Sequence, residues 1–246
     1  MEIRAKSISI RAAAAYCDFA VQKIEALIPN GDPFGHRRPW FEALVRPHAG
    51  VGHTPAEFMD VVYEARHCAE SDLEIITRLT SWLIRQSEST RLSINIHPDS
   101  LTSHYFVEEV MRCQFRLAAK GHSICLELVE FGAYSSQKIL IDHAQKLRNA
   151  GVLIALDDFG SRLNCFDLCA AGIVDLLKID TRVVGGLVND PNHHAVVRSI
   201  QALGDGLGAR VIAEGIETAE QLKVLTETGV EYGQGYYFHK PELVEC

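Results

Sequence analysis

The chain has 246 residues, of which 47% are hydrophobic, and this is enough apolar material for one large core. Its net charge of −8 disfavours nonspecific binding to a polymeric nucleic acid, and its apolar stretches are far shorter than the ~20 residues of a membrane helix. The N-terminus has no signal-peptide pattern. These features predict a soluble, cytoplasmic protein without a membrane partner.

Segments of β-rich apolar composition alternate with segments of helical periodicity along the chain. The expected strands are 19–28, 41–47, 92–97, 124–130, 153–159, 176–180, 210–217 and 232–238. Alternating strands and helices favour a parallel α/β fold. Eight strands in one domain, residues 1–246, favour a (β/α)8 TIM-like barrel over an open sheet.

The connecting segments carry helix signals. Pro55 opens one helix, and the apolar stripe from Leu73 to Ile84 marks a second. Thr218 and Gln221 form a capping box for another. Further helices are expected over 98–119, 136–149 and 194–207, and the N-terminal segment 1–17 is also expected to be helical.

The end of the chain departs from an ideal barrel. Eight residues follow Phe238, so the last helix is expected to be short or absent. Another segment must then cover the barrel where that helix is missing. The N-terminal residues around Ala12–Ala15 and a partner subunit are the two candidates.

Seven cysteines are scattered, their number is odd, and no Cys-x-x-Cys pair occurs. Thiols of a reducing compartment explain this pattern better than disulfides or a zinc site. Cys165 and Cys169 are four residues apart, which alone is a weak indication of a metal site.

Polar residues lie within the expected strands or at their carboxyl ends. They are Glu42, Asn95, Glu127, Glu130, Asp157, Asp158, Lys178, Asp180, Glu214, Glu217 and Gln234. In a barrel these ends meet at one mouth. So many carboxylates would repel one another, and Lys178 with Arg46 cannot balance them. Oxygen ligands of this kind suit Mg²⁺ or Mn²⁺.

Asp157-Asp158 is the strongest single signal. Neighbours in a strand point to opposite faces, so the backbone must turn there if both carboxylates are to reach metals. The following Phe159-Gly160 is a turn signal. Two ions ~3.5–4 Å apart could clamp the attacking and leaving oxygens of a phosphoryl displacement.

Each acid also has a purely structural explanation. Glu42 could pair with Arg46, and Lys178 could pair with Asp180. Asn95 could be a hydrogen-bonding turn residue, while Glu214 and Glu217 could be acids favoured by a helix N-terminus. These explanations require many coincidences at strand ends, so the metal site is the better interpretation.

The same residues, in the same order, resemble the motifs of the EAL-domain cyclic-di-GMP phosphodiesterases. The segments that carry the resemblance are Phe41-Glu-Ala-Leu-Val-Arg46, 55–58, 93–95, 126–130, Asp157-Asp-Phe-Gly160, 178–180, 214–217 and Gln234-Gly235. The resemblance covers about 200 residues. It implies a barrel whose first strand is antiparallel to the others, a homodimer, and hydrolysis of cyclic-di-GMP to linear pGpG by a metal-activated water.

The resemblance also implies a role for each residue. Glu42, Asn95, Glu127 and Asp157 would hold one Mg²⁺ or Mn²⁺ ion, and Asp157, Asp158 and Glu214 would hold a second. Lys178 would orient or activate the water together with the catalytic ligands Glu42, Asp157 and Glu214. Arg46, Gln234, Gln22, Asp180 and Glu217 would surround the substrate, and Glu130 would anchor the loop after Asp158.

One loop departs from the family pattern. Residues 161–166 read Ser-Arg-Leu-Asn-Cys-Phe, and Arg162 replaces a glycine of the family motif. The alternative function is therefore a catalytically impaired barrel that binds cyclic-di-GMP or a protein partner. A third possibility is another metal-dependent barrel enzyme, such as an enolase-like one that abstracts a proton with strand-end acids and a lysine.

Overall fold

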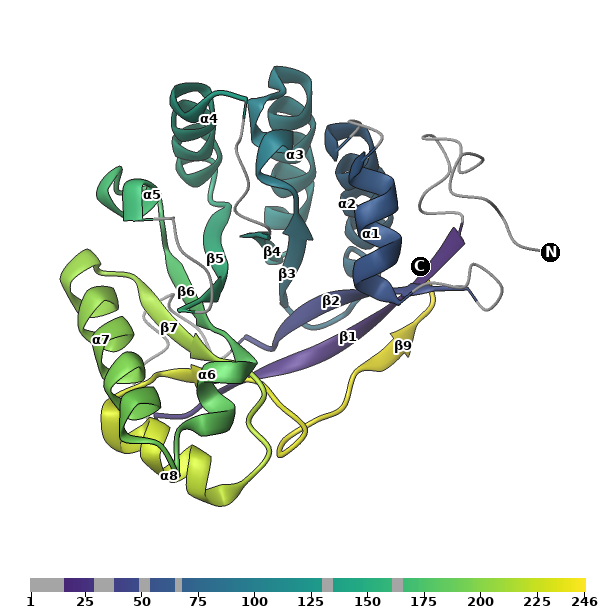
Figure 1. Ribbon diagram of the computed structural model, residues 1–246. Coiled ribbons are helices and arrows are strands. Elements are labelled where there is room, and N and C mark those ends of the chain that lie inside the picture. The colour runs from purple at the N-terminus through teal and green to yellow at the C-terminus, as the bar shows by residue number, and fades with distance from the viewer. Residues whose placement is uncertain (1–15, 29–37, 49–53, 65–67, 130–134, 161–165) are drawn as a thin grey trace.

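The computed structural model describes residues 16–28, 38–48, 54–64, 68–129, 135–160 and 166–246. Eight strands close into a barrel, and helices surround most of it (Figure 1). The barrel strands are β1 (Cys17–Ala26), β2 (Trp40–Pro47), β3 (Arg91–Ile96), β4 (Ser123–Leu128), β5 (Leu153–Phe159), β6 (Leu176–Ile179), β7 (Arg210–Ala213) and β8 (Tyr232–Gly233). The predicted TIM-like barrel is confirmed.

The first strand runs against the others. β1 pairs with β2 on one side and with β8 on the other, and both pairings are antiparallel. All pairings from β2 through to β8 are parallel. The antiparallel first strand that the family resemblance implied is therefore present.

The helices on the outside follow the capping signals of the sequence. They are α1 (Pro55–Glu64), α2 (Cys68–Leu83), α3 (His104–Ala118), α4 (Gln137–Asn149), α5 (Phe166–Ala170), α6 (Thr181–Gly186), α7 (Pro191–Leu207) and α8 (Ala219–Thr228). The capping box of Thr218 and Gln221 forms, and Gly208 ends α7 with φ +68°.

The expected single helix over 98–119 is wrong. A 3-10 helix, Pro98–Thr102, comes first, and α3 follows it. Ser103 lies between them in an extended conformation, and its hydroxyl accepts a hydrogen bond from the Phe106 amide. An N-cap serine thus divides what hydrophobic periodicity alone presents as one helix.

Two strands end at least four residues earlier than the sequence predicts. β7 ends at Ala213 rather than at Glu217, and β8 ends at Gly233 rather than at Phe238. The chain turns at Gly215, where φ is +68°, and Gly235 packs against the backbone of Ile216, where an added Cβ would lie 2.1 Å from the carbonyl oxygen. The residues after these strands therefore form turns that pack on each other at the barrel mouth.

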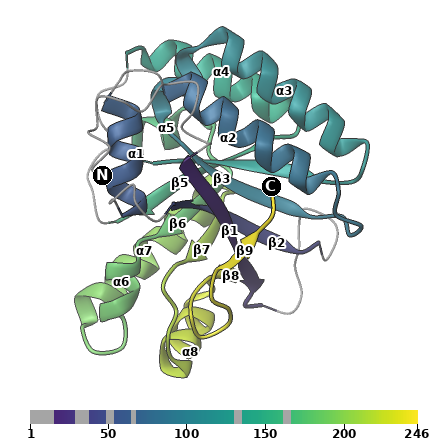
Figure 2. The same ribbon diagram turned by 90° about the vertical axis from the view of Figure 1, so that its right-hand side faces the viewer.

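A ninth strand covers the end of the barrel that lacks a last helix. Beside β1, β8 reaches only Glu25–Ala26, and β9 (Glu242–Val244) pairs antiparallel with Phe19–Val21 (Figures 1 and 2). A short strand therefore takes the place for which we expected the N-terminal segment or a partner subunit. Residues 1–15 of that segment lie outside the described residues, and β1 begins at Cys17.

Two layers of side chains fill the barrel. The lower layer is mostly apolar and consists of Ile24, Trp40, Ser93, Cys125, Ala155, Leu176, Ile212 and Tyr232, with Trp40 Nε1 donating to Ser93 Oγ at 3.0 Å. It closes one end of the barrel, so polar side chains can gather only at the other end. A larger apolar cluster packs the strands against the helices. Within the described residues, each helix is too short or too polar to cross a bilayer.

Candidate metal and substrate site

The upper layer of the barrel is polar at every strand. Its members are Gln22, Glu42, Asn95, Glu127, Asp157, Lys178, Glu214 and Gln234. On each parallel strand the polar residue lies two positions after its lower-layer partner, and on the antiparallel β1 it lies two positions before. A spacing of two keeps both residues on the inner face of the barrel. Strand geometry, continued one residue past the ends of β7 and β8, therefore gathers these eight side chains at one mouth.

The ammonium group of Lys178 lies at the centre of this layer. Its Nζ is 2.5 Å from Glu127 Oε2 and 2.7 Å from Glu214 Oε1. It is 3.0 Å from Asp157 Oδ1 and 3.6 Å from Glu42 Oε1. Four carboxylates thus share one fully buried cation, and the cluster carries an excess of negative charge when all four are ionised.

The crowding perturbs the protonation of these groups. Burial raises the pKa of Glu127 to about 8, and repulsion from other acids adds to this effect while Lys178 opposes it. Burial also raises the pKa of Glu214 well above its usual value. Burial disfavours the ammonium form of Lys178, yet the surrounding carboxylates raise its pKa well above the usual value. Without metals Lys178 is therefore a cation that donates hydrogen bonds.

Glu42 is held in one orientation by two amide donors. Asn95 Nδ2 donates to Glu42 Oε1 at 2.8 Å, and Gln234 Nε2 donates to Oε2 at 2.8 Å. Burial alone would raise the pKa of Glu42, but the Lys178 ammonium and these amides lower it. Glu42 is therefore a fixed carboxylate near the start of β2.

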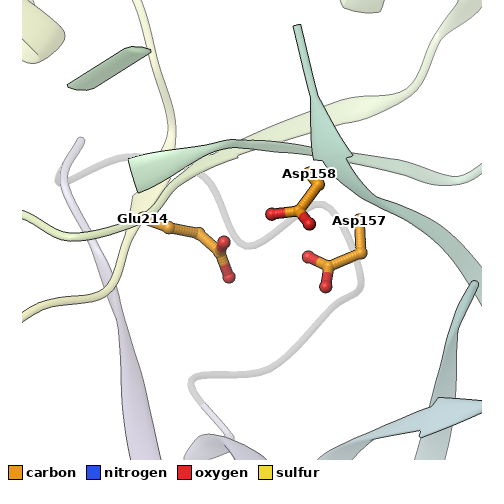
Figure 3. Close-up of side chains that lie close together, drawn as sticks. All are labelled: Asp157, Asp158 and Glu214. Atoms are coloured by element: carbon orange, nitrogen blue, oxygen red, sulfur yellow. The ribbon is translucent and has the colours of Figure 1, made fainter. Parts of the chain in front are cut away.

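The backbone turns at Asp158, the turn that a shared role of the two aspartates requires. Asp158 has φ +51°, and the pairing register between β5 and β6 shifts between Leu156 and Phe159. One oxygen each from Asp157, Asp158 and Glu214 lies within 4.8 Å of the other two, and Figure 3 shows the three side chains converging. A bulge thus brings adjacent residues of one strand to the same site.

The donor set fits divalent cations. Asn95 Oδ1 and Glu127 Oε1 are buried and have no hydrogen-bond partner among the described residues. Buried oxygens of this kind are normally satisfied by a donor, a water or an ion. Both oxygens come from neighbouring paired strands, and Asp157, Asp158 and Glu214 add a second group of carboxylate oxygens within 4.8 Å of one another. All are oxygen ligands, which hard cations such as Mg²⁺ and Mn²⁺ prefer.

Two cavities meet at the acid cluster. One, of about 370 Å³, extends under α1 and has mostly apolar walls that include Phe19, Met59 and Tyr63. The other, of about 420 Å³, extends toward the turns after β7 and β8, where Glu217 and Tyr236 line it. Glu42, Leu44 and Asp157 line both cavities. A ligand with two arms could thus place its centre on the carboxylates.

The other residues that the resemblance assigned to the substrate occupy different places. Arg46 lines the cavity under α1, and Gln22 and Glu217 line the second cavity. The carboxylate of Asp180 instead caps α6, accepting from the Arg182 amide at 2.6 Å and pairing with the Arg182 guanidinium. Glu130 and the loop 161–165 lie outside the described residues.

Several lining residues were missed in the sequence. Met59, Asp60 and Tyr63 face the first cavity from α1, and Thr181 and Tyr236 line the second. Helix α1 has an ordinary amphipathic pattern, which does not separate a residue that packs on strands from one that lines a cavity. Tyr236 follows Gln234-Gly235 directly, so its position after the last strand was the available signal.

Comparisons with known proteins match most of this chain to one family. The model of the EAL domain family matches residues 35–241. The chain is 29% identical over 211 residues to cyclic di-GMP phosphodiesterase PdeB of Shewanella oneidensis, covering 84% of this chain and 25% of PdeB. It is 34% identical over 152 residues to cyclic di-GMP phosphodiesterase PdeA of Borreliella burgdorferi, covering 62% of this chain and 23% of PdeA. The chain thus spans about a quarter of the length of these two relatives.

A solved structure gives a similar picture. Klebsiella pneumoniae BlrP1, in a complex with calcium and cyclic di-GMP at pH 8.0, superposes with a TM-score of 0.73 and 26% identity. The match covers 95% of this chain and 58% of that one. The barrel described above is therefore shared over nearly the whole of the present chain.

Proposed function

Because the chain belongs to the EAL domain family, we propose that it is a metal-dependent phosphodiesterase that hydrolyses cyclic di-GMP to linear pGpG. Named relatives act on cyclic di-GMP, and the donor set at the barrel mouth suits Mg²⁺ or Mn²⁺. Action on this second messenger in the cytoplasm, with a role in biofilm or motility control, and assembly as a homodimer are parts of the same proposal.

The meeting of two cavities at the carboxylates carries the proposal. A cyclic dinucleotide has two bases on either side of a phosphodiester ring. One base could enter the apolar cavity under α1 and the other the cavity beside Tyr236, with one phosphate over Glu42 and Asp157. A proton-abstracting enzyme for a small acid would need only one such compartment.

The residues of the chain divide the work of a phosphoryl displacement. Divalent cations held by these two sets of ligands would offset phosphate charge. They would also lower the pKa of a bound water, so that it attacks phosphorus as hydroxide. The Lys178 ammonium holds three of the ligand carboxylates in place. Arg46, at the cavity wall, can donate to a phosphate oxygen. The attacking water would lose a proton as its oxygen bonds to phosphorus, the opposite P–O bond would break, and a proton from solvent would complete the released hydroxyl as the ring opens.

Chromatography tests the proposal. Incubation with cyclic di-GMP and Mg²⁺ or Mn²⁺ should yield pGpG, and Glu42→Gln should lower the rate by at least about a hundredfold while the fold is retained. Glu227→Gln, an exposed site on α8, is the matched control and should leave the rate unchanged. Binding of cyclic di-GMP without turnover would contradict the proposed enzymatic activity and would indicate a cyclic di-GMP receptor instead.

A further inference from the structure

A relay of buried side-chain amides leads from the metal site to the backbone at His239. Gln234 Nε2 donates to Glu42 Oε2 at 2.8 Å and to Gln22 Oε1 at 2.9 Å. Gln22 Nε2 in turn donates to the backbone carbonyl oxygen of His239 at 2.8 Å. The three side chains are at most 7% exposed, so little water competes for these hydrogen bonds.

The chemistry of the partners fixes the direction of every bond. The His239 carbonyl can only accept, so the NH2 group of Gln22 must face it and the Gln22 oxygen must face Gln234. The Glu42 carboxylate also only accepts. Both hydrogens of the Gln234 amide are therefore used, and its Oε1 is left buried without a partner among the described residues. Gln22 thus determines how Gln234 is rotated.

We propose that Gln22 is a positioning residue that orients Gln234 and, through it, the metal ligand Glu42, rather than a contact to the substrate. The inference rests on the proposed metal site and departs from the substrate role that the family resemblance suggested. Both polar ends of the Gln22 amide are already bound within the protein, although the side chain lines a cavity. It connects the site to the turn that precedes β9.

Metal binding without substrate tests the inference. Calorimetric titration with Mn²⁺ should show about tenfold weaker binding in Gln22→Met, because supporting hydrogen bonds of this kind tune metal affinity by that order. Gln201→Met is the matched control: Gln201 is equally buried, but its amide bonds Asp205 within α7. Wild-type affinity for Mn²⁺ in a folded Gln22→Met variant would overturn the inference. If Gln22→Met does not fold, Gln22→Ala repeats the test.

A double-mutant cycle separates positioning from general packing. If Gln22 acts through Gln234, then Gln22→Met combined with Gln234→Met should bind Mn²⁺ no more weakly than Gln234→Met alone. Additive losses would contradict a route through Gln234. A raised KM for cyclic di-GMP with unchanged Mn²⁺ affinity would instead make Gln22 a substrate contact. If the wild type does not hydrolyse cyclic di-GMP but the coupling between Gln22 and Gln234 in Mn²⁺ binding is present, the proposed enzyme activity is contradicted and the positioning role of Gln22 stands.

Discussion

Lys178 lies at full burial among more negative charge than it can neutralise. A buried charge without a partner costs several kcal/mol, so the carboxylates depend on this ammonium whenever metals are absent. Its pKa is raised far above the usual value, which excludes a role as a neutral base in the metal-free protein. Lys178 therefore stabilises the folded barrel in addition to holding the carboxylates of the site.

Replacement of Lys178 tests this dependence. Lys178→Met should lower the free energy of unfolding of the metal-free protein by about 3–5 kcal/mol, since several carboxylates lose their cation. Urea unfolding measures the change, and added Mn²⁺ should restore part of it. Lys223→Met, at an exposed pair with Glu227, should shift stability by less than about 0.5 kcal/mol. An unchanged midpoint for Lys178→Met would contradict the dependence of the carboxylates on this ammonium.

Asp72 is a buried acid away from the metal site. It lies on α2 and accepts from Tyr63 Oη at 2.8 Å, from the His97 amide at 2.9 Å and from Ser100 Oγ at 2.6 Å. Burial raises the pKa of Asp72 from 3.8 to about 7 in spite of these donors. This residue ties α1 and α2 to the turn that follows β3.

The pH dependence of stability should report Asp72. Its folded pKa exceeds its unfolded pKa, so its contribution is fully present below about pH 3.8 and is lost as the pH rises to about 7. Between pH 5 and pH 8 this loss should reach roughly 2–3 kcal/mol. Asp72→Asn should remove it, so the variant gains on the wild type as the pH rises. Parallel urea curves at both pH values would mean that the three donors keep Asp72 ionised.

At the scale of elements, inward-facing positions were the most predictable part of the structure. Glu42, Glu127 and Lys178 each follow an apolar inward residue by two positions, so strand periodicity and the barrel rule place them together. The strand β9 was not predicted from the sequence, because three residues without a core of their own carry no periodic signal. The amide relay was not predicted either, since Gln22 and Gln234 are far apart in sequence and only the closed barrel brings them together.

The pairing of β9 with β1 can be tested by cross-linking. Phe19 lies opposite Val244, and the same register continued two residues past the end of β9 would bring Cys17 opposite Cys246 on one face. Opposed residues in an antiparallel pair have Cα atoms about 4.5–5.5 Å apart, within the range of a disulfide. The two thiols also share Arg78 and Asp18 as charged neighbours. We therefore expect the two thiols to lie within disulfide reach.

Diamide, which accepts two electrons and two protons, should join these thiols. Mass spectrometry of a non-reduced digest should find a peptide that links Cys17 to Cys246. The reaction should be slow, because burial raises the pKa of Cys17 to about 11. Cys17→Ser should abolish the link. Cross-linking of Cys246 to another cysteine instead would contradict the register.

At the scale of the whole molecule, the proposed substrate is an anion, whereas the protein is acidic. The net charge of −8 and the cluster at the mouth both repel phosphate, so bound cations are needed to reverse the local field. Binding of these cations to the folded state also stabilises it by mass action. The metal site should therefore be visible in the thermal stability of the intact chain before any substrate is added.

Thermal unfolding with Mn²⁺ measures this coupling. At a hundred times the dissociation constant, one ion contributes about 2.7 kcal/mol, which corresponds to a rise in Tm of about 5–10 °C for a chain of this length. Asp158→Asn should reduce the rise, and asparagine tolerates the positive φ at this position, so the backbone is preserved. Asp142→Asn, at an exposed pair with Lys138, should keep the full rise. If Tm rises equally in both variants, Mn²⁺ does not act through the site at Asp157, Asp158 and Glu214. An equal rise in Tm with sodium chloride at matched ionic strength would likewise show that Mn²⁺ acts by general screening.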